Sequence, residues 1–306
     1  LNLATVRLYS AFINENPAKE YLEKMDFKRL TEDDQKNLAT ALGGMNYGVS
    51  VAENTAAFST FANNGKYNNA YIIQEIRDHN EKVDYSAEVK PTQVYKDSTS
   101  YLMLNMLNYV INTGYGTSPD IAAALSFNTK NLFVKTGTSE YYKDLWVVGG
   151  STKITVGLWN GYDSPAKVPS YDYAQRSWIA VMNAIYALDK NLIAPDTAFS
   201  RPKSVVDASI NGYNNAKGGT KDIVPNGFKE LSKEKTLAKF GYNIDKGISF
   251  SDPSKVVVTK PVQKEEKKED KDKKDKEDKK EEREERTVTI TETSPPPTVI
   301  TEEDDE

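Results

Sequence analysis

Three short apolar runs, separated by turn residues, lie between residues 132 and 163 and constrain the fold more than any other part of the chain. The runs begin near Leu132, Leu145 and Ile154 and are rich in Val, Leu and Trp. Short runs of this composition, bounded by turn-forming residues, are typical of β-strands. Strands joined by short connections pair as antiparallel neighbours. The sequence therefore predicts an antiparallel three-stranded meander.

The first predicted strand continues into Lys135-Thr136-Gly137-Thr138-Ser139. Side chains alternate between the two faces of a strand, so Thr136 and Thr138 should share one face. Lys135 and Gly137 should share the other. Two neighbouring hydroxyls can hold a carboxylate, a lysine adds positive charge, and a glycine lets a ligand lie against the backbone. We therefore expect this stretch to line a ligand-binding site.

The order of motifs along these strands resembles the C-terminal part of the transpeptidase domain of class A penicillin-binding proteins. In that family a Lys-Thr-Gly-Thr strand, an Asp-x-Trp-x-x-Gly strand and a Trp-x-Gly-Tyr-Asp strand follow one another. The matching residues here are Lys135–Thr138, Asp144–Gly149 and Trp159–Asp163. Lys-Thr-Gly is an established motif of penicillin-binding proteins and β-lactamases. Residues 39–65 resemble a second family segment, which ends in Phe-Ala-Asn-x-Gly.

The resemblance implies an α+β fold of the penicillin-binding, serine-transpeptidase-like type. In it an antiparallel sheet is flanked by helices and joined to a mostly helical lobe, and the N-terminal part of the domain is expected upstream of residue 1. We expect residues 1–200 to form the C-terminal part of the transpeptidase domain. Residues 201–259 are expected to form a C-terminal extension with little periodicity, and residues 260–306 a charged tail.

Local patterns predict further elements of secondary structure. Ser50 and Glu53 have the spacing of a capping box at a helix start, and Asn63-Asn64-Gly65 is a helix stop. Tyr71–Ile76 has the composition of a strand, and the polar residues around His79 suggest a solvated turn. Apolar spacing predicts helices over residues 1–25, with a second helix opening at Pro17, and over residues 97–111 and 172–189.

The resemblance also implies the chemistry of a serine acyltransferase. Such an enzyme binds a peptidoglycan stem peptide that ends in D-Ala-D-Ala, acylates its serine and releases the last D-Ala. An amine of a neighbouring stem peptide then accepts the acyl group. β-Lactam antibiotics fit the same site because they carry a strained amide and a carboxylate in a similar relation. The resemblance implies no cofactor and no metal.

Each residue of the Lys-Thr-Gly strand has an expected role within this resemblance. Lys135 keeps the cleft positive, and the backbone N–H of Thr138 contributes to the oxyanion hole. The hydroxyls of Thr136 and Thr138 are expected to hold the terminal carboxylate. Gly137 and Ser139 complete the substrate-binding strand.

Asn2 is identified with the last residue of a Ser-x-Asn motif that contacts the substrate amide; the alternative is an ordinary residue at a helix N-terminus. The Ser-x-x-Lys motif, which holds the nucleophile and the base, is expected upstream, so this chain alone is predicted to be inactive. Ser164–Lys167 matches Ser-x-x-Lys, but it follows the Lys-Thr-Gly strand and lies in a proline-containing loop. Ser126–Asn128 matches Ser-x-Asn, but it lies too close to Lys135 to face it across a cleft.

Composition narrows the function classes. The chain has no Cys, which excludes disulfides, zinc–thiolate sites and a cysteine nucleophile. Residues 1–259 carry 28 basic and 27 acidic side chains, so charge gives no reason to expect nucleic acid as a partner. No apolar run reaches the roughly 18 residues of a membrane span. The resemblance places the protein at the extracytoplasmic face of the bacterial cell membrane through an upstream anchor, with cell-division or elongation machinery as further partners.

The C-terminal residues differ in composition from the rest of the chain. Residues 260–286 hold 12 basic and 12 acidic side chains, and residues 287–306 hold six acidic ones. Such composition favours disorder, with a solvated single helix as the alternative. The function of this tail stays open between a spacer in the cell wall and a solubilising segment.

Two further function classes are kept beside the transpeptidase. One is a non-catalytic, penicillin-binding-like module that binds wall peptide or a protein partner. The other is a serine β-lactamase, which is disfavoured because the Asp-x-Trp and Trp-x-Gly-Tyr-Asp strands and the tail resemble class A synthases.

Overall fold

The computed structural model describes residues 2–210 and 220–229, all of which fall in one unit of the chain. The predictions made for the charged tail, residues 260–306, lie outside the described residues. Most of the predicted extension, namely residues 211–219 and 230–259, also lies outside the described residues.

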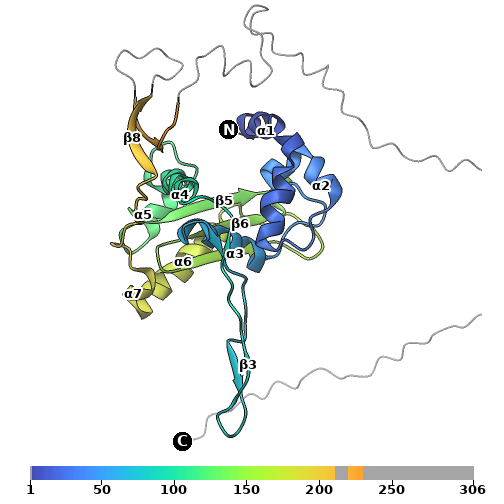
Figure 1. The fold of residues 1–306 in the computed structure, drawn as a ribbon. Helices are drawn as coiled ribbons and strands as arrows, with labels where there is room; N and C mark the ends of the chain where they lie inside the picture. The colour runs from blue at the N-terminus through green and yellow to red at the C-terminus, as the bar shows by residue number, and fades with distance from the viewer. Residues whose placement is uncertain (1, 211–219, 230–306) are drawn as a thin grey trace, which may run out of the picture. The chain divides into compact units, whose positions relative to one another are not determined.

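The central sheet is the predicted meander (Figure 1). Strands β5 (Phe133–Thr138), β6 (Leu145–Gly150) and β7 (Thr155–Asn160) pair in the order β5-β6-β7, and both pairs are antiparallel. Lys135 lies opposite Val148, and Thr138 lies opposite Leu145. The short connections that the sequence shows between the apolar runs are the turns of this sheet, so the prediction is confirmed.

Helices cover both faces of the sheet. Helix α6 (Tyr173–Leu188) packs against β6 and β7, while α4 (Asp97–Asn112) packs against β5 and α3 (Val51–Ala62) against β7. The predicted C-terminal helix is confirmed, and its Trp178 is fully buried. The indole Nε1 of Trp178 donates to the carbonyl oxygen of Val156 at 3.0 Å, which satisfies the polar atom inside the core.

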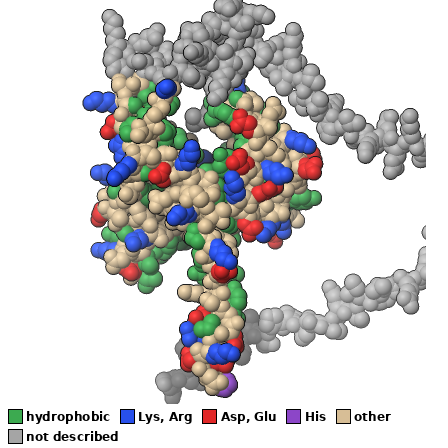
Figure 2. Space-filling model, viewed as in Figure 1, with side chains coloured by type: hydrophobic (Ala, Val, Ile, Leu, Met, Phe, Trp, Pro, Cys, Tyr) green, Lys and Arg blue, Asp and Glu red, His purple; other side chains and the backbone are tan. Residues whose placement is uncertain are grey.

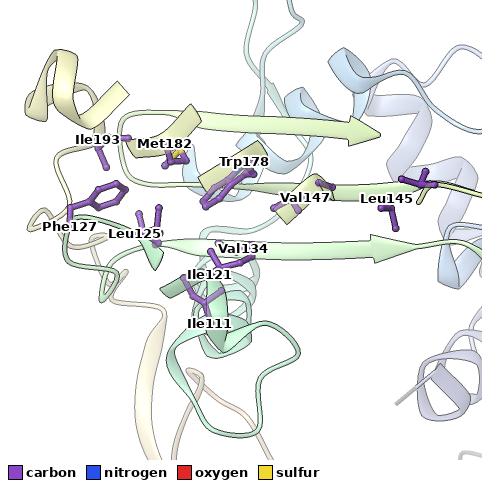
Figure 3. Packing of buried hydrophobic residues seen from close by; sticks show 13 residues of the cluster. Ile111, Ile121, Leu125, Phe127, Val134, Leu145, Val147, Trp178, Met182 and Ile193 are labelled. Atoms are coloured by element: carbon purple, nitrogen blue, oxygen red, sulfur yellow. The ribbon is translucent and has the colours of Figure 1, made fainter. Parts of the chain in front are cut away.

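Two hydrophobic clusters occupy the two faces. On one side, Val134, Val147 and Leu145 pack with Trp178 and Met182 of α6 (Figure 3). On the other side, Phe133 packs with Leu104 and Leu107 of α4. The two faces of β5 are therefore fixed by adjacent buried residues, as period-two alternation requires.

Helix α3 lies close against β7 because Gly157 has no side chain. A β-carbon at Gly157 would lie 1.8 Å from the hydroxyl oxygen of Thr55, which no real contact allows. The helix begins as predicted, with Ser50 and Glu53 forming a capping box. It ends at Ala62, after which the backbone turns through Asn64 and Gly65, which has a φ of +82°.

The helix predicted over residues 1–25 is broken into short pieces. Helix α1 (Asn2–Ser10) is separated from the pieces that follow Pro17 by Asn16, which has a left-handed φ of +48°. Helix α1 buries none of its residues and packs against η4. The remaining segments of this region are η1 (Ile13–Glu15), η2 (Ala18–Leu22), η3 (Glu23–Met25), α2 (Glu32–Lys36) and η4 (Leu38–Leu42).

A two-stranded arm extends from the body between α3 and α4 (Figure 1). It contains the ladder of β1 (Lys66–Tyr67) with β4 (Thr92–Gln93) and, further out, the hairpin of β2 (Glu75–Arg77) with β3 (Val83–Ser86). The strand predicted over Tyr71–Ile76 is wrong for its first four residues, because only Glu75 and Ile76 belong to β2. His79 lies exposed in the hairpin turn, as predicted, and Figure 2 shows the histidine at the far end of the arm.

The start of the predicted extension is more regular than its sequence suggested. Strands β8 (Val205–Ile210) and β9 (Thr220–Pro225) form an antiparallel hairpin, and Val205 and Val224 are buried. The short helices α5 (Pro119–Ala124), η5 (Glu140–Tyr142) and α7 (Lys190–Ile193) complete the regular elements of the described residues. Within residues 2–210 and 220–229, none of the helices has the length and apolarity that crossing a bilayer requires.

Candidate active site along the β5 edge

Strand β5 carries the predicted site residues from a buried start to an open end. Phe133 and Val134 are fully buried, whereas Lys135 and Thr138 are exposed and Thr136 and Gly137 are partly exposed. Because β5 is the outer strand of the three, one side of its backbone has no strand partner among the residues that the structure describes. The core therefore anchors the strand and leaves its polar half accessible.

The hydrogen-bond pattern decides which backbone groups face the open edge. The N–H of Ser139 donates to the carbonyl oxygen of Asp144 at 3.0 Å, so residues 139 and 144 form a hydrogen-bonded pair. In an antiparallel ladder such pairs alternate with pairs that exchange no bonds. By this alternation Gly137 bonds to β6, whereas Thr136 and Thr138 point their N–H and C=O groups away from it.

The side chain of Lys135 agrees with this assignment. Its Nζ donates a hydrogen bond to the carbonyl oxygen of Thr136. That oxygen can accept the bond because it faces the open edge. Among the residues that the structure describes, no carboxylate forms an ion pair with Lys135. Lys135 is exposed as a whole residue, but neighbouring protein atoms partly desolvate its ammonium and lower its pKa from the ordinary value of 10.5. The edge therefore carries a cation without an acidic partner, which favours an anionic ligand group.

A carboxylate fixes the turn that follows β5. Oδ2 of Asp144 accepts a hydrogen bond from the Ser139 hydroxyl at 2.9 Å, and its Oδ1 accepts one from Trp159 Nε1 at 3.0 Å. The backbone N–H of Asp144 donates to the Ser139 oxygen at 2.8 Å. Sequence reasoning found the Asp-x-Trp motif but not this role. The spacing of Ser139 and Asp144 around one hairpin turn is the signal that could have indicated it.

The other candidates from the sequence lie on other elements of the fold. Asn2 is exposed at the start of α1, and within residues 2–210 and 220–229 no hydrogen bond or ion pair joins it to β5. Ser164–Lys167 lies in an exposed loop rather than at a helix start. The Ser126 hydroxyl bonds to Asn183 Oδ1 at 3.0 Å, a structural contact with α6. The role given to Asn2 stays a prediction, and the reasons for setting aside the two internal motifs agree with the structure.

No metal site accompanies this edge in the described part of the chain. No group of three or more His, Cys, Asp and Glu side chains there is arranged to hold a metal ion. The β5 edge itself offers hydrogen-bond donors and one cation. Outward N–H groups, neighbouring hydroxyls and an ammonium can hold an extended peptide, its carboxylate and a developing oxyanion.

Comparisons with known proteins agree with this geometry. A family model described as the penicillin binding protein transpeptidase domain matches residues 8–171, more than half of the chain. Penicillin-binding protein 4 of Bacillus subtilis (strain 168) is 33% identical over 151 residues, which is 49% of this chain and 23% of that protein. Penicillin-binding protein 1A of Clostridium botulinum (strain Langeland) is 26% identical over 213 residues, or 69% of this chain and 24% of that protein.

One solved structure shows the same fold. The crystal structure of penicillin-binding protein 1A from Haemophilus influenzae matches with a TM-score of 0.62 and 22% sequence identity, covering 75% of this chain and 39% of that one. The predicted α+β architecture is thereby confirmed. The chain spans about a quarter of the length of the curated relatives named above.

Proposed function

Because the chain belongs to the penicillin-binding protein transpeptidase family, we propose that it forms the Lys-Thr-Gly side of a D-Ala-D-Ala transpeptidase active site. The observation that carries the proposal is the open β5 edge, where Thr136 and Thr138 turn their backbone groups away from β6 beside the unpaired cation of Lys135. An extended stem peptide can pair with such an edge as an added strand.

The reaction divides into two acyl transfers. The serine oxygen of the Ser-x-x-Lys motif, expected on an upstream segment, attacks the carbonyl of the penultimate D-Ala. The bond to the terminal D-Ala breaks, and its nitrogen leaves with the proton taken from the serine. The amine of a second stem peptide then attacks the ester carbonyl and forms the cross-link; the bond to the serine oxygen breaks, and that oxygen takes a proton from the attacking amine.

The residues of β5 bind the substrate and stabilise the tetrahedral intermediates without forming a covalent bond to them. The N–H of Thr138 donates to the oxyanion of each tetrahedral intermediate. Lys135 supplies positive charge on the α4 face of the strand, and the hydroxyls of Thr136 and Thr138 bind the terminal carboxylate. Gly137 lets the peptide approach the backbone. Ser139, whose hydroxyl is bonded to Asp144, ends the substrate-binding strand.

The rest of the proposal concerns the whole protein. Asn2 contacts the substrate amide when the upstream part of the domain is present. The complete protein is a class A synthase with a glycosyltransferase domain and an anchor upstream, and it acts outside the cytoplasm. Its substrates are peptidoglycan stem peptides, and its inhibitors are β-lactams. Its protein partners belong to the cell-division or elongation machinery. Residues 1–200, 201–259 and 260–306 are its transpeptidase part, extension and tail.

Covalent labelling by a fluorescent penicillin tests the proposal. The full-length protein should label, and Lys135→Ala should slow its acylation about 100-fold, as loss of a charged site group can. Lys130→Ala, an exposed lysine just before β5, is the matched control and should label normally. The 306-residue chain alone should not label. Unchanged acylation in Lys135→Ala would contradict the site, and a full-length protein that never labels would favour the non-catalytic module.

A further inference from the structure

Exposed tyrosines gather at the end of the sheet where β5 finishes. Tyr141 and Tyr142 lie in the turn between β5 and β6, and their side chains are 75% and 44% exposed. Tyr162 follows β7 at the same end of the sheet, and Tyr171 precedes α6; they are 49% and 66% exposed. We call these four residues the tyrosine surface.

Contacts hold the two segments of this surface together. The Tyr142 and Tyr171 rings lie 6.5 Å apart, and the Val168 N–H donates to the Tyr142 carbonyl oxygen at 2.9 Å. A β-carbon at Gly161 would come within 3.0 Å of the Lys143 carbonyl oxygen, so the chain passes directly beside the turn before it reaches Tyr162. Tyr142 and Tyr171 therefore lie side by side near the end of β5, and Tyr141 and Tyr162 belong to the chain segments that meet there.

The backbone of the turn is an unusual place for aromatic residues. Tyr141 and Tyr142 have φ values of +60° and +56°, a left-handed conformation that Gly or Asn adopts more readily. Such strain persists where surrounding contacts hold it, and it concentrates at ligand sites. The hydrogen bonds of Asp144 to Ser139 and Trp159 supply that support. Two aromatic rings at these positions indicate that the rings themselves have a use.

The chemistry of this surface selects its ligand. Tyrosine combines a flat apolar ring with a polar tip, which suits sugar rings, whose faces are apolar and whose edges carry hydroxyls. Acidic and basic side chains are interspersed here: Glu140 and Asp163 are exposed in the same segments as Lys143 and Lys167. Mixed charge gives no attraction for an anionic lipid surface. A neutral saccharide fits both the rings and the charges.

We propose that the tyrosine surface is a saccharide subsite that holds the glycan backbone of peptidoglycan while a stem peptide lies along β5. This inference rests on the proposed function, because the stem peptide is attached to that glycan. Its position continues the β5 edge beyond Ser139, so a single substrate can occupy both. The site extends recognition from the peptide to the polymer that carries it.

Binding of the 306-residue chain to neutral strands of β-1,4-linked N-acetylglucosamine, the uncharged sugar of the glycan repeat, tests this. The double variant Tyr162→Ala/Tyr171→Ala should bind these strands about tenfold more weakly. The corresponding double Phe variant, which keeps the rings, should retain most of the binding. Tyr115→Ala is the matched control, because Tyr115 is fully exposed in the connection between α4 and α5. Circular dichroism and thermal unfolding check that each variant keeps the fold.

Three results would overturn the subsite: no glycan binding by the unsubstituted chain, equal binding by the double Ala variant, or equal loss in Tyr115→Ala. Stronger binding to phosphatidylglycerol vesicles than to glycan would also overturn it, in favour of a membrane surface. Penicillin labelling of the unsubstituted full-length protein reports the proposed function separately. If the protein is labelled by penicillin but does not bind glycan, the proposed function stands and the saccharide subsite is refuted. If it binds glycan but is not labelled, the subsite stands and the proposed function is refuted.

Discussion

Replacing Thr138 by proline would remove one backbone N–H from β5 and leave its ladder to β6 intact. The register and the Ser139–Asp144 bond place this N–H on the open side of the strand. Proline is tolerated on edge strands where the missing N–H faces away from the partner. Gly137→Pro, one residue earlier, instead removes an N–H that bonds to β6. The two substitutions therefore separate catalysis from folding.

The two proline substitutions should differ in their effects on the acylation rate and on the free energy of unfolding. Loss of one oxyanion-hole donor costs about 100-fold to 1,000-fold in rate, or roughly 3–4 kcal/mol. The free energy of unfolding should change by less than about 1 kcal/mol in Thr138→Pro, since no ladder bond is lost. In Gly137→Pro it should fall by about 1–3 kcal/mol, because the carbonyl of Trp146 loses its donor.

The assay is the rate of acylation of the full-length protein by a fluorescent penicillin, with urea unfolding as the measure of stability. Thr138→Val is the control, because it removes the hydroxyl and keeps the N–H. Thr138→Val loses only the hydroxyl proposed to bind the carboxylate, so a greater loss of rate in Thr138→Pro than in Thr138→Val would assign the difference to the backbone N–H. If Thr138→Pro acylates at the normal rate, or unfolds as readily as Gly137→Pro, the direction assigned to the Thr138 N–H is wrong.

Other substitutions test the supports of the site. Asp144→Ala should lower the free energy of unfolding by about 1–3 kcal/mol through its lost hydrogen bonds, whereas the exposed Asp163→Ala should not; equal urea midpoints would contradict the role of Asp144. Partial desolvation puts the pKa of Lys135 below 10.5, so between the lowered value and 10.5 the unfolded chain binds more protons and stability should rise with pH. Lys135→Met should flatten that rise in urea titrations, and identical pH profiles would refute it. Gly157→Ala should lower the free energy of unfolding by about 1–3 kcal/mol, because the added methyl group meets Thr55 of α3. Adding Thr55→Ala should restore part of this loss, and no recovery in urea unfolding would contradict the close packing of α3 on β7.

Local sequence patterns determined much of the sheet and of its covering helices. The meander of β5, β6 and β7 could be predicted because each strand is a short apolar run with turn residues on both sides. Helix α3 could be predicted because Ser50 and Glu53 cap it within a single turn. The Lys135–Ser139 stretch could be singled out because its residue types carry chemistry at a strand end. In each case the information lies within a few residues of the chain.

Some local patterns were misleading because the deciding contacts are distant in sequence. Pro17 indicated the start of a second helix, but the apolar spacing over residues 1–25 gave no sign that both helices would be broken into short pieces. The apolar residues Tyr71–Ile73 resemble a strand, yet pairing in the arm begins only at Glu75. The hairpin of β8 and β9 was missed because each strand is stabilised by the other rather than by its own periodicity.

The sequence by itself determined which residues stand at the end of β5, and it linked them to a family. Only the tertiary structure decided that the N–H of Thr138 faces outward, that Asp144 joins Ser139 to Trp159, and that tyrosines from two separate segments meet in one surface. The physical reason is that strand pairing and side-chain hydrogen bonds join residues from different segments. Their directions depend on which strand lies alongside and in what register, and no short stretch of sequence carries that information.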